Sequence, residues 1–248
     1  HSLIVIEDCA HAHGHRWKGQ AAGSIGDLAT FSFQTSKLMT AGEGGIVVTS
    51  NSAFAMRLDS LVNCGRKEDG KHTYRGQVMG RNSRISEWQA AVLSCQLARL
   101  EAQTELREQR TAAFQARLEG MPGISFTTQD PRNTTRAAYQ FIVKYDPAGW
   151  GGAHRNRFLE ALRAEGVPAE GDFYVPLYED PLFAMDPVTN PLCNTDFSLD
   201  RFDCPVTAKA AYEEAIWLPH QLFLGSAEDV ADVAAAFEKI HANREDLQ

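Results

Sequence analysis

The feature that most constrains the fold is a buried strand leading directly into a polar loop with one lysine. The apolar run Leu28–Phe33 predicts a strand. A polar segment containing Lys37 follows, and three glycines within residues 42–45 allow sharp turns before a second apolar run, Ile46–Val48. Beside a hydrophobic sheet an ammonium group loses hydration, which favours the free, nucleophilic amine. Lys37 therefore suits a lysine that forms a Schiff base, although a loop lysine standing alone is more often a solvated surface residue.

An aspartate ends the strand that comes before this loop in the sequence. The run Leu3–Ile6 predicts a strand that ends in Glu7 and Asp8. Open α/β sheets bind ligands at the carboxyl ends of parallel strands, which is where Asp8 would lie. An aspartate and a lysine at adjacent strand ends suit pyridoxal phosphate, which takes a lysine on its aldehyde and an acid against its pyridinium nitrogen. The pattern predicts Lys37 and Asp8 as catalytic residues around this cofactor.

Several motifs across the chain occur in the order typical of one enzyme family. They are Ile6–Ala12, Gly23–Asp27, Phe31–Phe33 with Lys37 and Gly42–Gly45, Gly80–Arg84, Glu87–Ala91, and Trp217–Gln221. In these motifs the chain resembles the DegT/DnrJ/EryC1/StrS family of pyridoxal-phosphate-dependent sugar and cyclitol aminotransferases. The resemblance implies an α/β chain of the aspartate-aminotransferase fold type I. Residues 1–107 would be the remainder of a large, mostly parallel-sheet cofactor domain, and residues 108–248 a small C-terminal α+β domain.

The resemblance also implies further cofactor-binding residues. His11 would lie by the cofactor ring and hydrogen-bond its phenolic oxygen. The Ser32 hydroxyl would contact the cofactor phosphate. Asn82 would reach across a homodimer interface to the phosphate in the neighbouring subunit, so that two subunits share each active site. Without the resemblance, a strand serine bonded to backbone explains Ser32 equally well, and a turn asparagine is the favoured explanation of Asn82.

The same resemblance points to the reaction and to two candidate substrate residues. It implies transfer of an amino group from glutamate or glutamine to a keto sugar or cyclitol ketone in antibiotic, aminocyclitol or amino-sugar biosynthesis. Members of the family that dehydrate sugars carry histidine in place of the lysine, so Lys37 favours transamination. Tyr178 stands where the family often has a histidine, and His220 is a second candidate, although packing in a loop explains it equally well. The sequence around Lys37 is similar to that of the cyclitol and aminobenzoate-forming members. A 3-amino-5-hydroxybenzoate synthase-like activity is the less favoured alternative.

Composition limits the remaining function classes. The net charge of −8 argues against nucleic acid as a partner, and no apolar run is long enough to span a bilayer. Five cysteines with no CxxC pair favour free thiols in the cytoplasm. The alternating residues His11, His13 and His15 would share one face of a strand, but no carboxylate or thiol pattern completes a metal ligand set. We therefore predict no metal site. Metal binding through these histidines is kept as a further hypothesis.

The start of the chain bears on its activity. The chain opens directly into an apolar strand, whereas members of the family carry a long N-terminal segment before this point, with a phosphate-binding helix start and a ring-stacking aromatic residue. We therefore expect the chain to be the C-terminal part of a longer or truncated protein. A non-catalytic remnant or assembly partner of such an enzyme is the alternative hypothesis.

Periodicity and capping signals predict the main elements. A helix is expected from an N-cap at Ser52 through about Val62, and further helices from Ser86 toward Leu118, over 156–165 and from Ser226 onward. Strands are expected over 124–128 and 138–145. Gly166 is the expected stop of the third helix, and Ser226 and Asp229 have capping-box spacing. On the long helix, Trp88, Ala91, Val92 and Cys95 recur at helical spacing and predict a face packed in a core or between domains.

Overall fold

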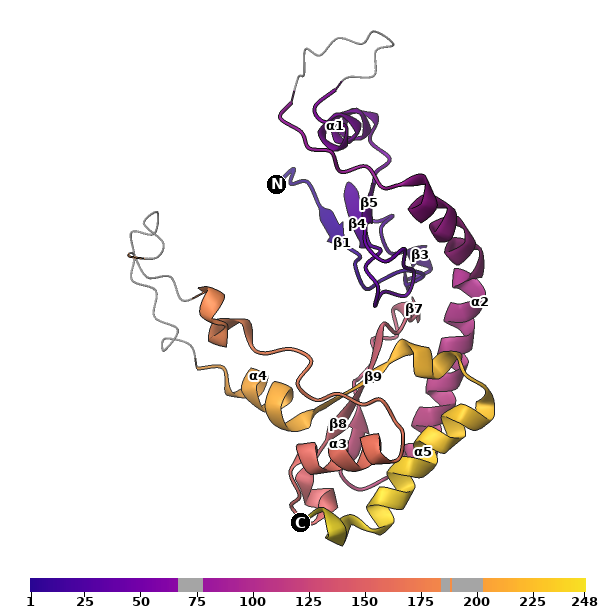
Figure 1. Cartoon of the computed structure of the whole chain (residues 1–248), viewed down its shortest axis with the longest axis vertical. Helices are drawn as coiled ribbons and strands as arrows, with labels where there is room; N and C mark the ends of the chain where they lie inside the picture. Colours follow the sequence, from indigo (N-terminus) through magenta and orange to yellow (C-terminus); the bar gives the residue numbers. More distant parts are fainter. Residues whose placement is uncertain (67–77, 184–187, 189–202) are drawn as a thin grey trace. The chain divides into compact units, whose positions relative to one another are not determined.

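The computed structural model describes residues 1–66, 78–183, 188 and 203–248, and these residues form two compact units (Figure 1). Unit 1 contains residues 1–109 and 129–139, and unit 2 contains residues 110–128 and 140–248. The chain thus leaves unit 1 within a long helix and returns to it once, at residues 129–139. The domains predicted from the sequence, 1–107 and 108–248, include no such return, and their independence stays a prediction.

A three-stranded sheet forms the centre of unit 1. Its strands, in spatial order, are β1 (Ile6–Asp8), β4 (Leu28–Ser32) and β5 (Gly45–Val48). β1 runs parallel to β4, with Asp8 opposite Thr30, and β4 runs antiparallel to β5. The parallel pair places the carboxyl ends of β1 and β4 at the same edge, as the sequence predicted for Asp8 and the loop that carries Lys37.

The first strand is shorter than predicted. Only Ile6–Asp8 pairs with β4, because β4 begins at Leu28 and the chain before it turns through Gly26 and Asp27. Leu3, Ile4 and Val5 precede the strand and are exposed, with 77%, 59% and 54% of their surface accessible. Val5 is held by its backbone alone, since its N–H donates to the Asp27 carboxylate at 2.8 Å and its carbonyl accepts from the Asp27 N–H at 2.9 Å.

A second small sheet was not predicted. It consists of β2 (Arg16–Trp17), β3 (Gln20–Ala21) and β7 (Asn133–Thr135), with β2 in the middle and both pairings antiparallel. Strands of two or three residues are too short to show an alternating pattern, which is why the sequence does not reveal them. Their pairing attaches the returning segment 129–139 to the histidine-containing loop of unit 1.

Two helices follow the central sheet. α1 (Ser52–Val62) ends where predicted, but its N-cap is Asn51 and not the predicted Ser52. The Asn51 side chain accepts from the N–H groups of Ala53 at 2.9 Å and Phe54 at 3.3 Å. α2 (Glu87–Leu118) also has the predicted bounds and ends before Gly120, which has a φ of +79°. A left-handed residue after the last turn is the usual way for a helix to stop.

The predicted packing of the first part of α2 is wrong for the described chain. Trp88 is 86% exposed and Val92 47% exposed, and Ala91 and Cys95 are exposed as well. Leu93 is the buried residue nearby, where it packs with Phe33 and Met39. Helical spacing identifies side chains that share a face, but it does not identify what covers that face.

Unit 2 is built on an antiparallel sheet covered by helices (Figure 1). Its strands, in spatial order, are β6 (Ile124–Phe126), β8 (Gln140–Tyr145) and β9 (Ala215–Pro219). Helices α3 (Arg155–Ala164) and α5 (Ala227–Ala242) pack against each other and share one core with the sheet. The ring of Phe114 is central to that core and meets four other phenylalanine rings, those of Phe126, Phe141, Phe223 and Phe237. Each fully buried phenylalanine contributes about 1.5–3 kcal/mol, so this cluster is a large part of the stability of unit 2.

The ends of these helices confirm the sequence signals. α3 stops before Gly166, which has a φ of +86°. α5 starts with a complete capping box, in which the Asp229 N–H donates to the Ser226 hydroxyl at 3.0 Å and the Ser226 N–H donates to the Asp229 carboxylate at 2.7 Å. The predicted face of α5, which includes Val230, Ala234 and Phe237, is buried.

The other described elements are short. They are a π-turn, Ala210–Glu214, which follows α4 (Pro205–Lys209), and five 3₁₀ turns, Pro147–Trp150, Leu177–Glu179, Pro181–Phe183, His220–Leu224 and Arg244–Leu247. In the part of the chain that the structure describes, no helix combines the length and the apolar character needed to cross a bilayer.

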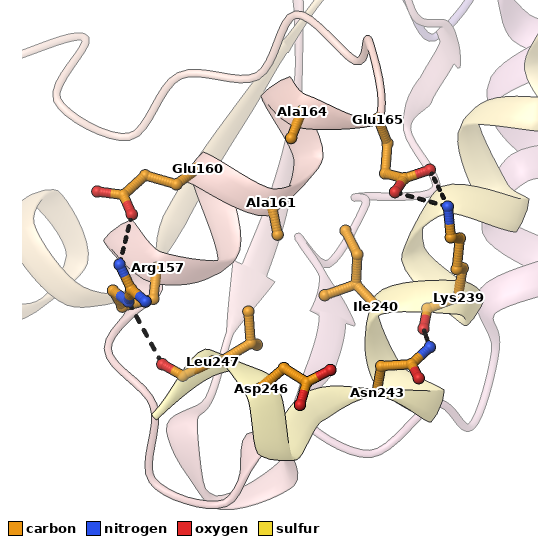
Figure 2. Close-up of a pocket in the computed structure, with 10 residues that line it drawn as sticks. All are labelled: Arg157, Glu160, Ala161, Ala164, Glu165, Lys239, Ile240, Asn243, Asp246 and Leu247. Atoms are coloured by element: carbon orange, nitrogen blue, oxygen red, sulfur yellow. Dashed lines mark hydrogen bonds and ion pairs between the residues drawn. The ribbon is translucent and has the colours of Figure 1, made fainter.

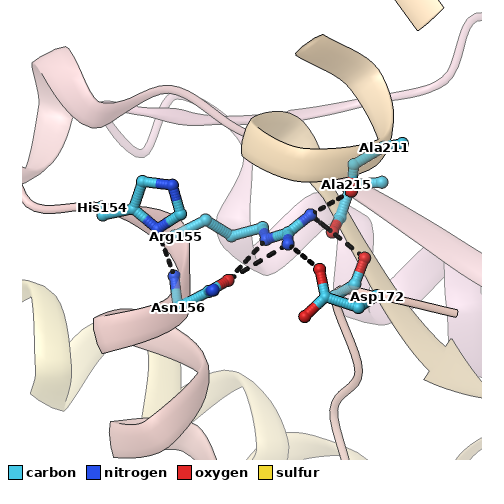
Figure 3. A network of polar contacts seen from close by, with 7 residues as sticks. His154, Arg155, Asn156, Asp172, Ala211 and Ala215 are labelled. Carbon is cyan, nitrogen blue, oxygen red and sulfur yellow. Dashed lines mark hydrogen bonds and ion pairs between the residues drawn. The ribbon is translucent and has the colours of Figure 1, made fainter. Parts of the chain in front are cut away.

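A buried arginine holds three segments of unit 2 together (Figure 3). Arg155, the first residue of α3, is only 1% exposed. Its Nη1 donates to the carbonyls of Gly171 at 3.1 Å, Ala211 at 2.6 Å and Ala215 at 3.1 Å, and its Nη2 donates to the Asp172 carboxylate at 2.7 Å. Because a planar fork satisfies several acceptors at once, one side chain fixes the positions of residues distant in sequence.

Replacing Arg155 by lysine should lower the free energy of unfolding by about 2–4 kcal/mol, because an ammonium group cannot serve all four acceptors and leaves buried carbonyls unsatisfied. Urea unfolding of the purified chain measures the change. Arg157→Lys on the same helix is the matched control. Its ion pair with Glu160 is exposed on both sides and should contribute less than about 1 kcal/mol. Equal losses in the two variants would show that the buried fork does not stabilise unit 2.

Candidate active site

Lys37 sits on a loop that its own backbone and side chains hold in place. The Ala41 N–H donates to the Phe33 carbonyl at 3.0 Å, and the Thr35 hydroxyl donates to the Gly42 carbonyl at 2.9 Å. The two residues after the lysine, Leu38 and Met39, are buried and anchor the loop to the core of unit 1. The side chain of Lys37 is half-buried, so it projects from a fixed base rather than from a loose surface loop.

Two polar residues before the lysine set the turn. The Gln34 side-chain oxygen accepts from the Ser36 N–H at 2.8 Å and from the Ser36 hydroxyl at 2.7 Å. The Ser36 Oγ also lies 2.6 Å from the Tyr139 hydroxyl. Gln34, for which the sequence indicated no role, therefore orients the serine that meets a tyrosine from the returning segment.

Tyr139 is a site residue that the sequence analysis missed. Its ring is 7% exposed. The His11 ring stacks on it with centroids 4.1 Å apart and an interplanar angle of 22°, and the Lys37 Nζ lies over it at 4.7 Å from the centroid. Tyr139 is far from both residues in sequence and stands next to an ordinary strand, so no local pattern distinguishes it. The only available signal was its position within the predicted strand 138–145.

Asp8 and His11 lie at the carboxyl end of β1. The Asp8 carboxylate is exposed, and its Oδ1 accepts from the Ala10 N–H at 3.1 Å. Burial lowers the pKa of His11, the positive charge of Lys37 lowers it further, and the negative charge of Asp8 opposes the shift. The charges of both predicted catalytic residues, Asp8 and Lys37, therefore act on the His11 imidazole.

Glu7, next to Asp8, has a structural role. Its carboxylate accepts from the N–H groups of Gly23 at 2.9 Å, Ile25 at 2.8 Å and Gly26 at 2.6 Å. Burial alone would raise the pKa of Glu7, but these three donors outweigh it and the net shift is downward. Because side chains alternate along a strand, Glu7 holds the loop beside β1 while Asp8 points the other way.

The three histidines of the alternating run have separate surroundings. His13 is buried, with its ring 5.2 Å from that of Phe31 and 6.0 Å from that of Phe33. The His15 Nε2 lies 3.1 Å from the Asn133 side-chain oxygen. Residues 11–15 form turns instead of a strand, so the histidines do not share a face. Within the described ranges, no group of three or more histidine, cysteine, aspartate or glutamate residues is arranged to hold a metal ion.

The other predicted cofactor residues lie at defined places in unit 1. Ser32 is the last residue of β4, and its hydroxyl accepts from the Gln34 N–H at 3.3 Å. Asn82 is exposed and forms an isolated antiparallel bridge with Asn63, at the end of α1. The Arg84 guanidinium donates to the Asn63 side-chain oxygen at 2.5 Å and fixes that bridge. Contacts of Ser32 and Asn82 with a cofactor stay predictions.

The two predicted substrate residues belong to unit 2. Tyr178 lies in the 3₁₀ turn Leu177–Glu179, and its hydroxyl donates to the Cys204 carbonyl at 3.4 Å. His220 is buried and starts the turn His220–Leu224. Contacts of these two side chains with a substrate stay predictions.

Unit 2 also has an open groove of about 560 Å³ between α3, α5 and the C-terminal turn (Figure 2). Both of its basic side chains pair with acidic ones. The Arg157 guanidinium donates to Glu160 at 2.9 Å, and the Lys239 ammonium contacts Glu165 at 2.8 Å. A groove whose basic side chains are already paired offers few positive groups that could orient a ligand. The cluster around Lys37 is the stronger candidate site.

The sequence matches a known family over almost its whole length. The model of the DegT/DnrJ/EryC1/StrS aminotransferase family matches residues 1–238. The chain is 41% identical, over all of its length, to a Streptoalloteichus tenebrarius protein named "Putative L-glutamine:3-amino-2,3-dideoxy-scyllo-inosose aminotransferase". It is 33% identical over 98% of its length to the L-glutamine:scyllo-inosose aminotransferase of Streptomyces griseus. The chain spans 61% and 60% of the lengths of these two relatives.

A solved structure supports the same fold. The crystal structure of 3-amino-5-hydroxybenzoic acid synthase superposes with a TM-score of 0.79 at 29% identity and covers 97% of this chain. The chain covers 61% of that structure. These likenesses confirm the family resemblance and the pyridoxal-phosphate fold type I that the sequence motifs predicted.

The buried His13 should make the chain sensitive to acid. Burial lowers its pKa to about 4 from an ordinary value of 6.5, the Ser32 backbone opposes that shift, and the charges of Lys37 and His11 add to it. Between these two pH values the unfolded chain binds a proton that the folded chain does not, so stability should fall as the pH drops through this window. The loss from this group is at most about 3 kcal/mol.

Urea unfolding at a series of pH values from 7 to about 4 measures this effect. The slope of unfolding free energy against pH should flatten in His13→Leu, which cannot titrate. His154→Asn is the matched control, because asparagine keeps the N-cap acceptor that His154 provides for α3 and should leave the slope unchanged. An unchanged slope in His13→Leu would contradict the assignment.

Proposed function

Because the chain belongs to the DegT/DnrJ/EryC1/StrS aminotransferase family, we propose that the protein it spans is a pyridoxal-phosphate-dependent aminotransferase. It moves an amino group from L-glutamine to a cyclitol ketone. The observation that supports this most is the arrangement of Lys37, half-buried over the Tyr139 ring, beside His11 and within the same electrostatic environment as Asp8. Aminotransferases of this family depend on pyridoxal phosphate in general.

The chemistry of these side chains fits that cofactor. The Lys37 amine suits its aldehyde, and the Asp8 carboxylate suits a protonated pyridine nitrogen. The His11 imidazole can donate a hydrogen bond to the phenolic oxygen, and the Ser32 hydroxyl can donate to the phosphate. Since each group of the cofactor has a matching side chain at one edge of the sheet, we assign all four residues to cofactor binding.

Asp8 supports the chemistry through its charge. When bound, pyridoxal phosphate supplies a ring that withdraws electrons from the carbon attached to the reacting nitrogen. The Asp8 carboxylate would hold a proton on the pyridine nitrogen and so keep the ring electron-withdrawing. Its position at the end of a paired strand means that its charge is already in place and does not have to reorganise during the reaction.

Lys37 moves the proton in each half of the reaction. With the cofactor bound, its free amine would remove the proton from the α-carbon of the amino donor and return it to the cofactor carbon, so it would act first as a base and then as an acid. The anchored loop suits this task, because a proton carrier must stay within hydrogen-bonding reach of both carbons.

The substrates are proposed from the relatives. The names of the curated proteins at 41% and 33% identity specify L-glutamine as the donor and an inosose as the acceptor. We assign a cyclitol ketone to this protein on that basis, with Tyr178 and His220 as candidate contacts. A 3-amino-5-hydroxybenzoate synthase-like activity is the second candidate. It is supported by the structural likeness to that enzyme, but at the lower identity of 29%.

A second copy of the chain is the proposed partner. Apolar side chains around Asn82 and the start of α2 are exposed in the isolated chain, among them Met79 at 98% and Trp88 at 86%. Large apolar side chains exposed to this extent in one part of the chain favour an interaction surface. Burial of this surface in a homodimer would carry Asn82 toward the neighbouring cofactor phosphate, as the family resemblance implies.

Mixing the purified chain with pyridoxal phosphate should produce a yellow absorbance band, and borohydride should remove the band and fix the cofactor on the peptide that contains Lys37. Peptide mass spectrometry locates the attachment. Lys37→Ala should abolish both signals, because no other amine lies beside Asp8 and His11 among the described contacts. Lys18→Gln is the matched control, since Lys18 is an exposed turn lysine of the same unit. A chain that stays colourless would support the alternative of a non-catalytic remnant.

With cofactor bound, L-glutamine should bleach the band and scyllo-inosose should restore it, because the amino group leaves the donor in the first half-reaction and reaches the ketone in the second. L-Glutamate should act at least about tenfold more slowly, as expected when one hydrogen bond to the donor amide is lost. Stopped-flow absorbance compares the two donors. Bleaching by glutamate alone would contradict the proposed donor.

A further inference from the structure

The segment 129–139 belongs to unit 1, although the residues on both sides of it belong to unit 2. Its attachment is extensive. β7 pairs with β2, the Lys18 N–H donates to the Arg132 carbonyl at 2.7 Å, and the Gly19 N–H donates to the Thr134 hydroxyl at 2.8 Å. The Arg136 N–H donates to the Glu108 carboxylate at 2.7 Å. We call this segment the strap, and its last residue is Tyr139.

The strap places the Tyr139 ring in a defined position. Its hydroxyl lies 2.6 Å from the Ser36 Oγ, and its ring packs in a small apolar cluster with Leu38 and Ala137. Both ends of the ring are therefore held, one by a hydrogen bond and the other by packing. A buried ring fixed in this way can orient whatever lies against its face.

Two groups lie against that ring. The His11 imidazole stacks on it, and the Lys37 Nζ lies 4.7 Å from its centroid. An ammonium group within about 6 Å of an aromatic centroid is attracted by the negative face of the ring, whereas a neutral amine is not. The ring therefore attracts the Lys37 ammonium group and provides it with a preferred position.

We propose that Tyr139 is a positioning residue that holds the released Lys37 ammonium and the His11 imidazole against one ring between the two halves of the reaction. This inference rests on the proposed function, because it assigns the ring a task in the cycle during which Lys37 is free. The returned proton comes from the ammonium form, so a group that stabilises that form at a fixed place keeps the acid ready where it is needed.

The labelling rate of the Lys37 amine tests this assignment without any cofactor. Trace acetylation of the full chain at neutral pH, followed by peptide mass spectrometry, reports the fraction of each lysine present as free amine. Tyr139→Leu keeps apolar bulk but removes the ring quadrupole, and should raise the Lys37 labelling rate by about two- to five-fold, the range expected for loss of one such contact. Tyr139→Phe keeps the ring and removes only the hydroxyl, and should stay close to the unmodified chain.

Internal controls separate this effect from unfolding. Lys144 and Lys239 form ion pairs in unit 2, and their labelling rates should not change in either variant of a folded chain. If Tyr139→Leu unfolds the chain, the labelling rates of Lys37, Lys144 and Lys239 should all rise. The comparison then uses Tyr139→His, whose smaller ring should give a Lys37 labelling rate above that of the phenylalanine variant. Equal Lys37 rates in the leucine variant and the unmodified chain would overturn the proposal. So would a rise in the phenylalanine variant as large as that in the leucine variant, because the hydroxyl and not the ring would then be responsible.

The outcome is distinguishable from a failure of the proposed function. Labelling requires only the free chain, so it can show the predicted pattern when no yellow band forms with pyridoxal phosphate. Conversely, a band with normal borohydride trapping and no effect of Tyr139→Leu on labelling would leave the aminotransferase assignment intact and overturn the role of Tyr139.

Discussion

The parallel pairing of β1 with β4 is the constraint on which the rest of the site depends. It sets Asp8 opposite Thr30 and brings the carboxyl ends of both strands to one edge. The residues that follow these strands, His11 on one side and Lys37 on the other, then come close enough to act on each other electrostatically. A shift of the register by one residue would turn Asp8 to the opposite face of the sheet, because side chains alternate along a strand. The Glu7 carboxylate opposes such a shift, since it is bonded to three N–H groups in the neighbouring loop.

The edge of the sheet alone does not complete the site. Unit 1 gains Tyr139 from the strap, which joins it after an excursion of the chain through β6 of unit 2. The two-residue strand β2 is small, yet it is the element that binds the strap to the histidine-containing loop. Secondary structure of minimal length thus determines which aromatic ring faces the lysine. The Gln34–Ser36–Tyr139 hydrogen bonds then connect that ring back to the lysine loop itself.

Sequence reasoning succeeded where a signal is local and failed where it depends on a partner. The capping box at Ser226 and the stop at Gly166 were predictable because each depends on residues within one turn of the chain. The family motifs pointed to Lys37 and Asp8 and to the fold. Tyr139 was missed because its importance arises from contacts with His11 and Lys37, more than a hundred positions away. The prediction that the Trp88 face of α2 is packed failed for a related reason. Helical periodicity shows which side chains share a face, but not what covers that face.

The surroundings of Lys37 involve more than burial beside the sheet. Desolvation by the sheet favours the free amine, which is the argument available from the sequence. The structure adds the Tyr139 ring, which attracts the ammonium form, and the Asp8 carboxylate, whose charge acts in the same region. Both groups attract an ammonium group, and Lys37 is only half-buried, so desolvation is not the one influence on its side chain. A side chain that must be base in one step and acid in the next benefits from a fixed position, because each proton transfer needs a short distance to the reacting atom. In this account the sheet edge supplies the loop that carries Lys37, and the strap supplies the ring against which its ammonium group lies.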